Sequence, residues 1–427
     1  MELFFVFLTL FGLLILRVPI FASLAGATIV GILLEPRLTM LEVVRNSIIG
    51  IDSLVLFAAP LFVLAGNLIL VGGVSQRLVG WVDNLFGFSR LRLVYVNVFG
   101  SMFFGGISGS ATADSAAIGS VLVPEMKRQG YPTAYSAAVT AASSSIGIII
   151  PPSVPMILAG AATSVSVTKL FVGGYLPGLL IALSLATVGY LTRPKGEWQA
   201  QRKSWSWQRM GRLTWIALPA LIFPVVIMVG ILGGVFTATE AAAVAVVYAL
   251  AVSAFIYREL GWKSFMKSLS DSAMFASVVF VIVATAQAFG WYLTYTRVPQ
   301  KLADFMLGVS DSRTVVILLM ILLLLIIGTF LETVPIVLVL YPILEPIATQ
   351  IGMDPTHYGV MFMASIAVGL LTPPYGVLLF VNSKIAGIPS AQLIRAVLPF
   401  VGILIVDALI VAFVPSLVLG PVDLFFD

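Results

Sequence analysis

Long apolar runs separated by short polar stretches cover the whole chain. A membrane-crossing helix needs roughly 20 mostly apolar residues, and these runs lack the strict alternation that is typical of barrel strands. The pattern therefore predicts an all-α polytopic membrane protein. We place its crossings near residues 2–16, 18–34, 53–73, 134–165 and 171–191, and near 215–234, 240–257, 272–295, 358–383 and 397–419.

Two further apolar segments are divided by small polar residues at their middle. They cover about 91–124, around GGISGSATADS, and about 313–345, around GTFLETVP. Two ordinary crossings joined by a polar loop would also fit this pattern. We prefer two re-entrant helical hairpins, because Gly, Ser and Thr cluster at the centre of the first segment rather than at a membrane edge.

Two of the crossings contain adjacent prolines, in SSSIGIIIPPSVPMILAG (143–160) and in AVGLLTPPYG (367–376). Proline has no N–H, so each pair should interrupt its helix and leave carbonyls unpaired. Such carbonyls cost several kcal/mol in hydrocarbon unless they line a cavity or bind an ion. A proline kink relieved by water or by Ser and Thr is the alternative. The carbonyls expected to be free are those of Gly147, Ile148, Gly369 and Leu370.

The two halves of the chain repeat one another. Pro151-Pro152 and Pro373-Pro374 are 222 residues apart (373 − 151), and Gly147 and Gly369 share that offset (369 − 147). Short polar helices, LTMLEVVRNS and LGWKSFMKSLS, also pair between the halves. The sequence thus predicts two repeats, 1–191 and 214–427.

Residues 192–213 form a basic linker between these repeats, which the positive-inside rule places in the cytoplasm. Five crossings on either side then put both termini in the periplasm. An odd number of crossings per repeat gives the repeats opposite orientations, so the architecture is an inverted-topology repeat.

Composition narrows the function further. The 427 residues are 60% hydrophobic and 10% charged, with no Cys and a single His, and the net charge is only +4. A lipid bilayer is therefore the expected surrounding, and nucleic acid is not an expected partner. An intramembrane enzyme would need a base beside a nucleophile, and we expect His357 to lie in a loop. The apolar N-terminus predicts a retained helix rather than a removed signal peptide.

The hairpin tips suggest anion-binding chemistry. Ser110 or Thr112 can cap the helix that follows, and Thr329 with Glu332 fits a T-x-x-E capping box. Helix N-termini near the midplane favour an anion, whereas freed carbonyls and hydroxyls suit Na⁺ better than Ca²⁺ or Mg²⁺. Asp114 and Glu332 are either ion ligands or helix caps, and the sequence leaves both roles open.

Several stretches resemble the large membrane subunit of the tripartite ATP-independent periplasmic (TRAP) transporters, with the sialic acid type as a candidate. They include GGISGSATADSAAIGSVLVPEM, SSSIGIIIPPSVPMI, FTATEAAAVAVVYAL and GLLTPPYGVLLF. The resemblance implies Na⁺-coupled import of an organic anion across a bacterial inner membrane by an elevator mechanism, with no other cofactor. It also implies two partners, a small membrane (Q) subunit, which we expect to be a separate chain, and a periplasmic substrate-binding protein.

The resemblance also implies the site residues. One sodium cluster would comprise Ser108, Ser110, Gly147, Ile150 and Pro152. A second would comprise Gly328, Thr329, Thr333, Gly369, Thr372 and Tyr375. The candidates for substrate contact are Thr112, Asp114, Ser145 and Glu332.

The substrate is less well defined by the sequence. The broken helices contain no Arg/Lys pair that would hold a dicarboxylate at both ends. A monocarboxylate such as sialic acid is therefore favoured, with a C4-dicarboxylate as the alternative. An ion channel is a further alternative, although inverted repeats with paired hairpins favour alternating access.

Overall fold

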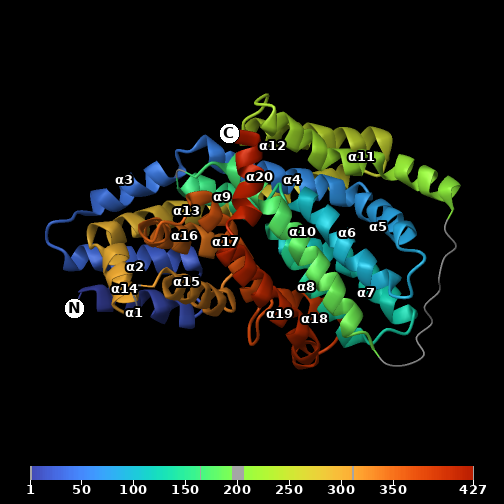
Figure 1. Ribbon diagram of the computed structural model, residues 1–427. Coiled ribbons are helices and arrows are strands. Elements are labelled where there is room, and N and C mark those ends of the chain that lie inside the picture. Colours follow the sequence, from blue (N-terminus) through green and yellow to red (C-terminus); the bar gives the residue numbers. More distant parts are fainter. Residues whose placement is uncertain (1, 164, 195–205, 310–311, 427) are drawn as a thin grey trace.

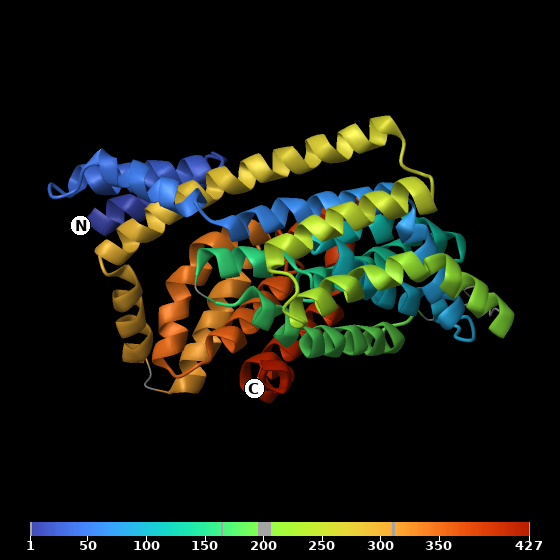
Figure 2. The same ribbon diagram turned by 90° about the horizontal axis from the view of Figure 1, so that it is seen from above.

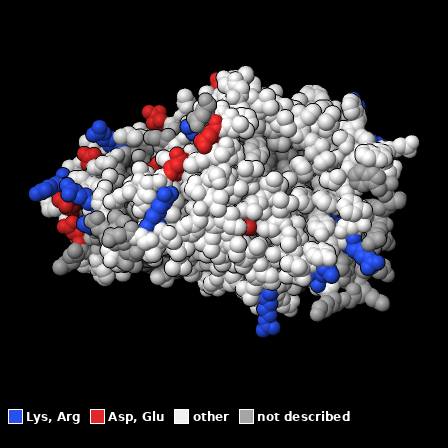
Figure 3. Space-filling view, in the orientation of Figure 1, with Lys and Arg blue, Asp and Glu red and all other residues white. Residues whose placement is uncertain are grey.

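The computed structural model describes residues 2–163, 165–194, 206–309 and 312–426, and every regular element within these ranges is a helix. Seven of these helices are at least 18 residues long and apolar enough to cross a membrane. Figure 3 shows a face that is almost free of charge across its middle, with Lys, Arg, Asp and Glu mostly toward its edges. The predicted all-α polytopic membrane fold is confirmed.

One set of helices forms an outer layer along one side of the molecule (Figure 2). Within it α13 packs against α2, α3 and α4, and α12 packs against α4 and α11. The outer layer consists of α1 (Glu2–Ile15), α2 (Ile20–Leu34), α3 (Met40–Ile51), η1 (Leu54–Phe57), α4 (Ala58–Val71), α11 (Trp207–Leu232), α12 (Ala238–Ala251), the π-turn η3 (Val252–Ile256) and α13 (Trp262–Tyr295).

A second set, which we call the core group, contains the hairpins and the interrupted helices. In it α8 packs against α6, α7 and α19, and α17 packs against α15 and α19. The core group consists of α6 (Arg92–Ser108), α7 (Ala111–Arg128), α8 (Thr133–Ser144), η2 (Ser145–Ile148), α9 (Val154–Ala162), α10 (Val167–Leu191), α15 (Arg313–Gly328), α16 (Thr333–Gln350), α17 (Pro355–Gly369), α18 (Val377–Ala386), α19 (Ser390–Phe413) and α20 (Ser416–Phe426).

Two short helices connect the outer layer to the core group. They are α5 (Val74–Leu85), which precedes the first hairpin, and α14 (Val298–Val309), which precedes the second. Figure 1 shows them at opposite ends of the molecule. Each follows a residue in the left-handed region, Gly73 with φ 70° and Arg297 with φ 57°. The sequence analysis missed both helices, because neither is long or apolar enough to register as a crossing.

The first hairpin turns at its small residues, and both helix breaks occur at proline pairs. In the first hairpin, Gly109 (φ 59°) ends α6, and Ser110 caps α7 by accepting a hydrogen bond from the Ala113 N–H. The two interrupted helices are α8–η2–α9 and α17–α18, and each break contains its Pro-Pro pair. Local sequence chemistry thus dictates both interruptions.

One contact is present in both halves, and in each it links the interrupted helix to the long helix that follows it. The Tyr135 hydroxyl donates to the Gly189 carbonyl at 2.5 Å, and His357 Nε2 lies 2.8 Å from the Val411 carbonyl. The side chains are 222 residues apart (357 − 135), and so are the carbonyls (411 − 189). The repeat seen in the sequence is therefore also a repeat of contacts, while the boundaries 1–191 and 214–427 stay predictions.

Three expectations are wrong. His357 does not lie in a loop, because it is buried in the first turn of α17. The polar helix LGWKSFMKSLS is not separate, since α13 runs unbroken from Trp262 to Tyr295. The last crossing ends at Phe413, before Pro415, and α20 follows it. Of the predicted linker 192–213, residues 195–205 lie outside the described ranges, and its end is already helical in α11.

Candidate functional site

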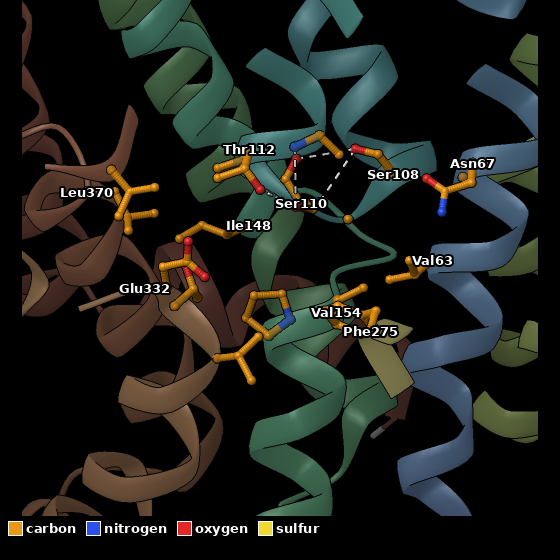
Figure 4. A pocket seen from close by; sticks show the side chains of 18 of the residues that line it. Val63, Asn67, Ser108, Ser110, Thr112, Ile148, Val154, Phe275, Glu332 and Leu370 are labelled. Carbon is orange, nitrogen blue, oxygen red and sulfur yellow. Dashed lines mark hydrogen bonds between the residues drawn. The ribbon is translucent and has the colours of Figure 1, made fainter. Parts of the chain in front are cut away.

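A cavity of about 220 Å³ lies where the outer layer faces the core group. Its outer-layer wall is formed by α4 and by Phe275 of α13. Its other walls come from both hairpin tips and from both breaks, which contribute Ile148 and Leu370 at equivalent positions (370 − 148 = 222). Figure 4 shows these side chains turned toward one space. Elements of both repeats therefore build one site.

Four helices begin at this cavity. The wall includes the first residues of α7 (Ala111), α9 (Val154), α16 (Thr333) and α18 (Val377). Free N–H groups and the positive end of each helix dipole concentrate at such positions. The cavity therefore has an electrostatic preference for an anionic group that no cationic side chain needs to supply.

The polar side chains of the wall are mostly neutral. Ser110 Oγ lies 3.2 Å from Thr112 Oγ1 at the tip of the first hairpin. Asn67 of α4 donates to Ser272 Oγ of α13 at 3.0 Å and so links two helices of the outer layer. Glu332 is the one charged residue in the wall, and among the described residues no Lys or Arg lines it.

The structure brings the first predicted sodium cluster together. Ser108 Oγ lies 3.5 Å from both the N–H and the carbonyl oxygen of Ser110. Gly147 packs against this tip so closely that an added Cβ would lie 3.3 Å from the Ser110 carbonyl oxygen. The Pro152 carbonyl faces Gly109, and Ile150 packs under Gly106. All five predicted residues thus surround the tip of one hairpin.

The second predicted cluster is also assembled, but it is more open. Gly328 and Gly369 are in backbone contact, since a Cβ on Gly328 would lie 2.9 Å from Gly369 Cα. Tyr375, 56% exposed, contacts the ring of Phe330 with centroids 5.7 Å apart. The Thr372 hydroxyl donates to the Val368 carbonyl at 2.7 Å. The remaining members are Thr329, which is buried, and Thr333, which lines the cavity.

The expectation of unpaired carbonyls is wrong at three positions. The Ile148 carbonyl accepts from Ser153 Oγ at 2.7 Å, the Gly369 carbonyl from the Thr372 N–H at 3.0 Å, and the Leu370 carbonyl from the Leu378 N–H at 3.1 Å. The missing donors are supplied locally, by a tight turn before the second proline pair for Gly369 and by residues that follow the proline pairs for Ile148 and Leu370. Each carbonyl oxygen keeps a second lone pair, so these bonds do not prevent ion binding.

Two other predictions need correction or placement. Thr329 and Glu332 do not form a capping box, because Thr329 ends α15 and donates to the Ile326 carbonyl, while Glu332 is itself the N-cap of α16. Of the candidates for substrate contact, Thr112 and Glu332 line the cavity. Asp114 and Ser145 are fully buried behind it.

Gly105 is a residue that the sequence analysis missed. A Cβ at this position would lie 2.8 Å from Gly147 Cα, so α6 crosses the first break in the same way that Gly328 of α15 crosses the second. The signal was present in the pair Gly105-Gly106 just before the tip. Its meaning depends on which helices cross, and that information is not local.

Hairpins and interrupted helices around one cavity, in a chain of apolar helices, are typical of membrane transporters. The DctM component of the tripartite ATP-independent periplasmic transporters matches residues 7–417. The chain belongs to this family.

Named relatives cover most of the chain. It is 36% identical over 404 residues to the isethionate TRAP transporter permease protein DctMQ of Oleidesulfovibrio alaskensis, covering 95% of this chain and 64% of that protein. It is 36% identical over 422 residues to the sialic acid TRAP transporter large permease protein SiaM of Vibrio cholerae, covering 97% of each. The YdaH transporter of Alcanivorax borkumensis shares the fold, with a TM-score of 0.64, 16% identity and coverage of 87% of this chain and 86% of that one.

Proposed function

We propose that this chain imports an organic monocarboxylate across the bacterial inner membrane, coupled to Na⁺, with both termini in the periplasm. Sialic acid is the favoured substrate. The convergence of four helix N-termini on one cavity carries this proposal, because it provides an anion site whose only charged side chain is Glu332. The two predicted sodium clusters lie beside the same hairpin tips, so bound cations would add positive potential to the anion site.

An elevator movement fits the position of the cavity. One wall belongs to the outer layer and the others to the core group, so displacement of the core group would carry a bound substrate past a fixed wall. The left-handed residues before α5 and α14 stand where these two connecting helices leave the outer layer. They are the positions where the connecting helices can change direction.

The partners follow from membership of a tripartite family. We propose that a periplasmic binding protein delivers the substrate and that a small membrane (Q) subunit completes the assembly. The relatives are named for isethionate and for sialic acid, so the family accommodates different acids. A C4-dicarboxylate is the second candidate, and it would need a counter-charge for its second carboxylate, which the described wall residues do not offer.

Uptake into proteoliposomes tests the proposal. The chain, its small subunit and the binding protein loaded with sialic acid are combined under an inward Na⁺ gradient without ATP. We expect saturable uptake that stops when choline replaces Na⁺ or when the binding protein is omitted. Uptake driven equally well by choline would refute sodium coupling. Flux that does not saturate and needs no binding protein would indicate a channel.

A further inference from the structure

Asp114 is a buried carboxylate for which the transport cavity gives no role. It lies in the first turn of α7 with 0% of its surface exposed, and neither carboxylate oxygen has a geometrically defined hydrogen-bond partner. Among the described residues it takes part in no ion pair. The other carboxylate buried within the helices, Asp407, accepts a hydrogen bond from Ser184. Asp114 is therefore the exception.

The polar groups around Asp114 present lone pairs rather than protons. Ser101 of α6 and Ser144 of α8 are polar neighbours of the carboxylate, and the hydroxyl of each donates to a different acceptor. Ser144 Oγ donates instead to the Thr140 carbonyl at 2.8 Å, and Ser101 Oγ donates to Ser143 Oγ at 3.1 Å.

The direction of the Ser101 bond follows from its neighbours. Asn97 donates its amide to Thr140 Oγ1 at 2.7 Å, which turns its carbonyl oxygen toward Ser143. Ser143 Oγ donates to that oxygen at 3.0 Å. A serine hydroxyl has one proton, so the proton of Ser143 is used and Ser101 must be the donor to it. Two helices, α6 and α8, thus face the carboxylate with hydroxyl oxygens.

Among the described residues, no positively charged side chain forms an ion pair with this carboxylate. An ionised carboxylate without donors or counter-charge costs several kcal/mol in a buried site, and the dipole of α7 offsets only part of this. Carboxylate and hydroxyl oxygens are ligands for a hard cation. A single carboxylate balances the charge of a monovalent cation. Sites for Ca²⁺ or Mg²⁺ normally contain further carboxylate ligands.

We propose that Asp114, Ser101 and Ser144 bind a monovalent cation, with Na⁺ as the occupant. This site is separate from the two sodium clusters already described and adjoins the first of them. Asp114 follows Ser110 by four residues, which is about one helical turn, and Ser101 precedes Gly105 by the same number. The inference rests on the proposed sodium coupling and adds a third cation to it.

Thermal unfolding of the purified protein in NaCl and in choline chloride tests the site without requiring transport. We expect Na⁺ to stabilise the wild type. Asp114→Asn removes the buried charge, so in choline this variant should be at least as stable as the wild type, while its stabilisation by Na⁺ should be smaller. Asp407→Asn is the matched control, a neutralised buried carboxylate elsewhere in the core group, and it should keep the full Na⁺ effect.

The possible outcomes separate the competing roles. If Asp114→Asn lowers stability equally in both salts, Asp114 is only structural and the proposal fails. If the wild type shows no response to Na⁺, the proposed coupling fails together with it. If Asp114→Asn responds to Na⁺ as the wild type does, the coupling stands and only the third cation is refuted.

Transport stoichiometry provides the second measurement. The ratio of ²²Na⁺ to substrate taken up should fall by one in Asp114→Asn relative to the wild type. An unchanged ratio with a higher Na⁺ requirement would mean that Asp114 acts on the first cluster through its charge, which overturns the proposal. Wild-type uptake that follows a pH gradient in the absence of Na⁺ would identify a proton as the occupant and also overturn it.

Discussion

The two hairpin–break pairs follow the same plan but differ in how firmly they are held. At the first, Ser108 is 4% exposed, Ser110 caps α7, and Ser153 joins the two sides of the break. At the second, Tyr375 is 56% and Phe330 58% exposed, and neither α16 nor α18 has a side-chain cap. The first hairpin and break are thus held by more side-chain contacts than the second, so we expect the second to rearrange more easily.

The acids near the two hairpin tips differ in the same way, although the counterpart of Glu332 at the 222-residue offset is Ser110 (332 − 110), the N-cap of α7. Asp114 and Glu332 each precede a proline by ten residues (124 − 114 and 342 − 332). Asp114 is fully buried, whereas Glu332 is exposed in the cavity wall. One inverted sequence plan has thus placed one acid among buried hydroxyls and the other beside the substrate space. A duplication can keep its backbone geometry while its two copies diverge in chemistry.

The largest expected effect on uptake comes from substitutions that push apart the hairpin and the break where their backbones cross. Gly105→Ala would place a methyl group 2.8 Å from Gly147 Cα, and Gly328→Ala would place one 2.9 Å from Gly369 Cα. Overpacking of this kind costs about 1–3 kcal/mol or more. We expect uptake to fall at least about tenfold in both variants. The loss should be greater for Gly105→Ala, since the first pair cannot move aside.

Gly100→Ala is the matched control in the same helix, because its Cβ would lie 3.9 Å from the nearest atom, Ile118 Cδ1. Uptake by this variant should be close to that of the wild type. Equal losses for Gly105→Ala and Gly328→Ala would contradict the idea that the second pair is the more adaptable one. If both variants take up substrate as fast as the wild type, these backbones are not closely packed against one another in the membrane.

The fold could be predicted from the sequence wherever local chemistry decides it. Proline pairs interrupt helices, glycine and serine turn hairpins, and apolar runs form crossings, and each of these appears in the structure. The repeat of 222 residues even predicted which positions would be equivalent. The connecting helices α5 and α14 could not be predicted in this way, because they are short and their role depends on the parts that they join.

The site was only partly predictable for a related reason. Residues at the tips and breaks could be named, since special backbone geometry leaves a signature in residue type. The donors that satisfy Ile148 and Leu370 could not, because they lie beyond the proline pairs and reach these carbonyls only after the chain has turned there. The contributions of Asn67 and Phe275 to the wall depend on how the outer layer packs against the core group. No local pattern records that arrangement.

Substitutions in the two sodium clusters should have an intermediate effect, which appears in the Na⁺ dependence of uptake. Ser110→Ala in the first and Thr372→Val in the second each remove one hydroxyl oxygen that we propose as a ligand. Losing about 1 kcal/mol of cation binding would raise the Na⁺ concentration for half-maximal uptake roughly fivefold. Uptake is measured against Na⁺ concentration at saturating substrate. Comparing the two shifts shows whether the firmly held and the open cluster bind their ions equally.

Ser277→Ala serves as the control for these variants. Its hydroxyl is exposed on α13 and bonds only to the Ala273 carbonyl of its own helix, at 2.9 Å. The Na⁺ response of this variant should match that of the wild type. If Ser110→Ala and Thr372→Val match it too, the assignment of the sodium residues is wrong, whatever the fate of the wider transport proposal.

The last comparison concerns the stability of the breaks themselves, and its second variant has the smallest expected effect. Ser153→Ala removes a buried bond to Ile148 across the first break and the cap on the Met156 N–H, which should cost about 1–2 kcal/mol. Thr372→Val removes only a local bond from the break to the Val368 carbonyl four residues earlier, and such bonds contribute little, so we expect less than about 0.5 kcal/mol. Unfolding midpoints in detergent measure both. Equal destabilisation would mean that the second break is held as firmly as the first, and the contrast between the two halves would then lie only in their exposure to solvent.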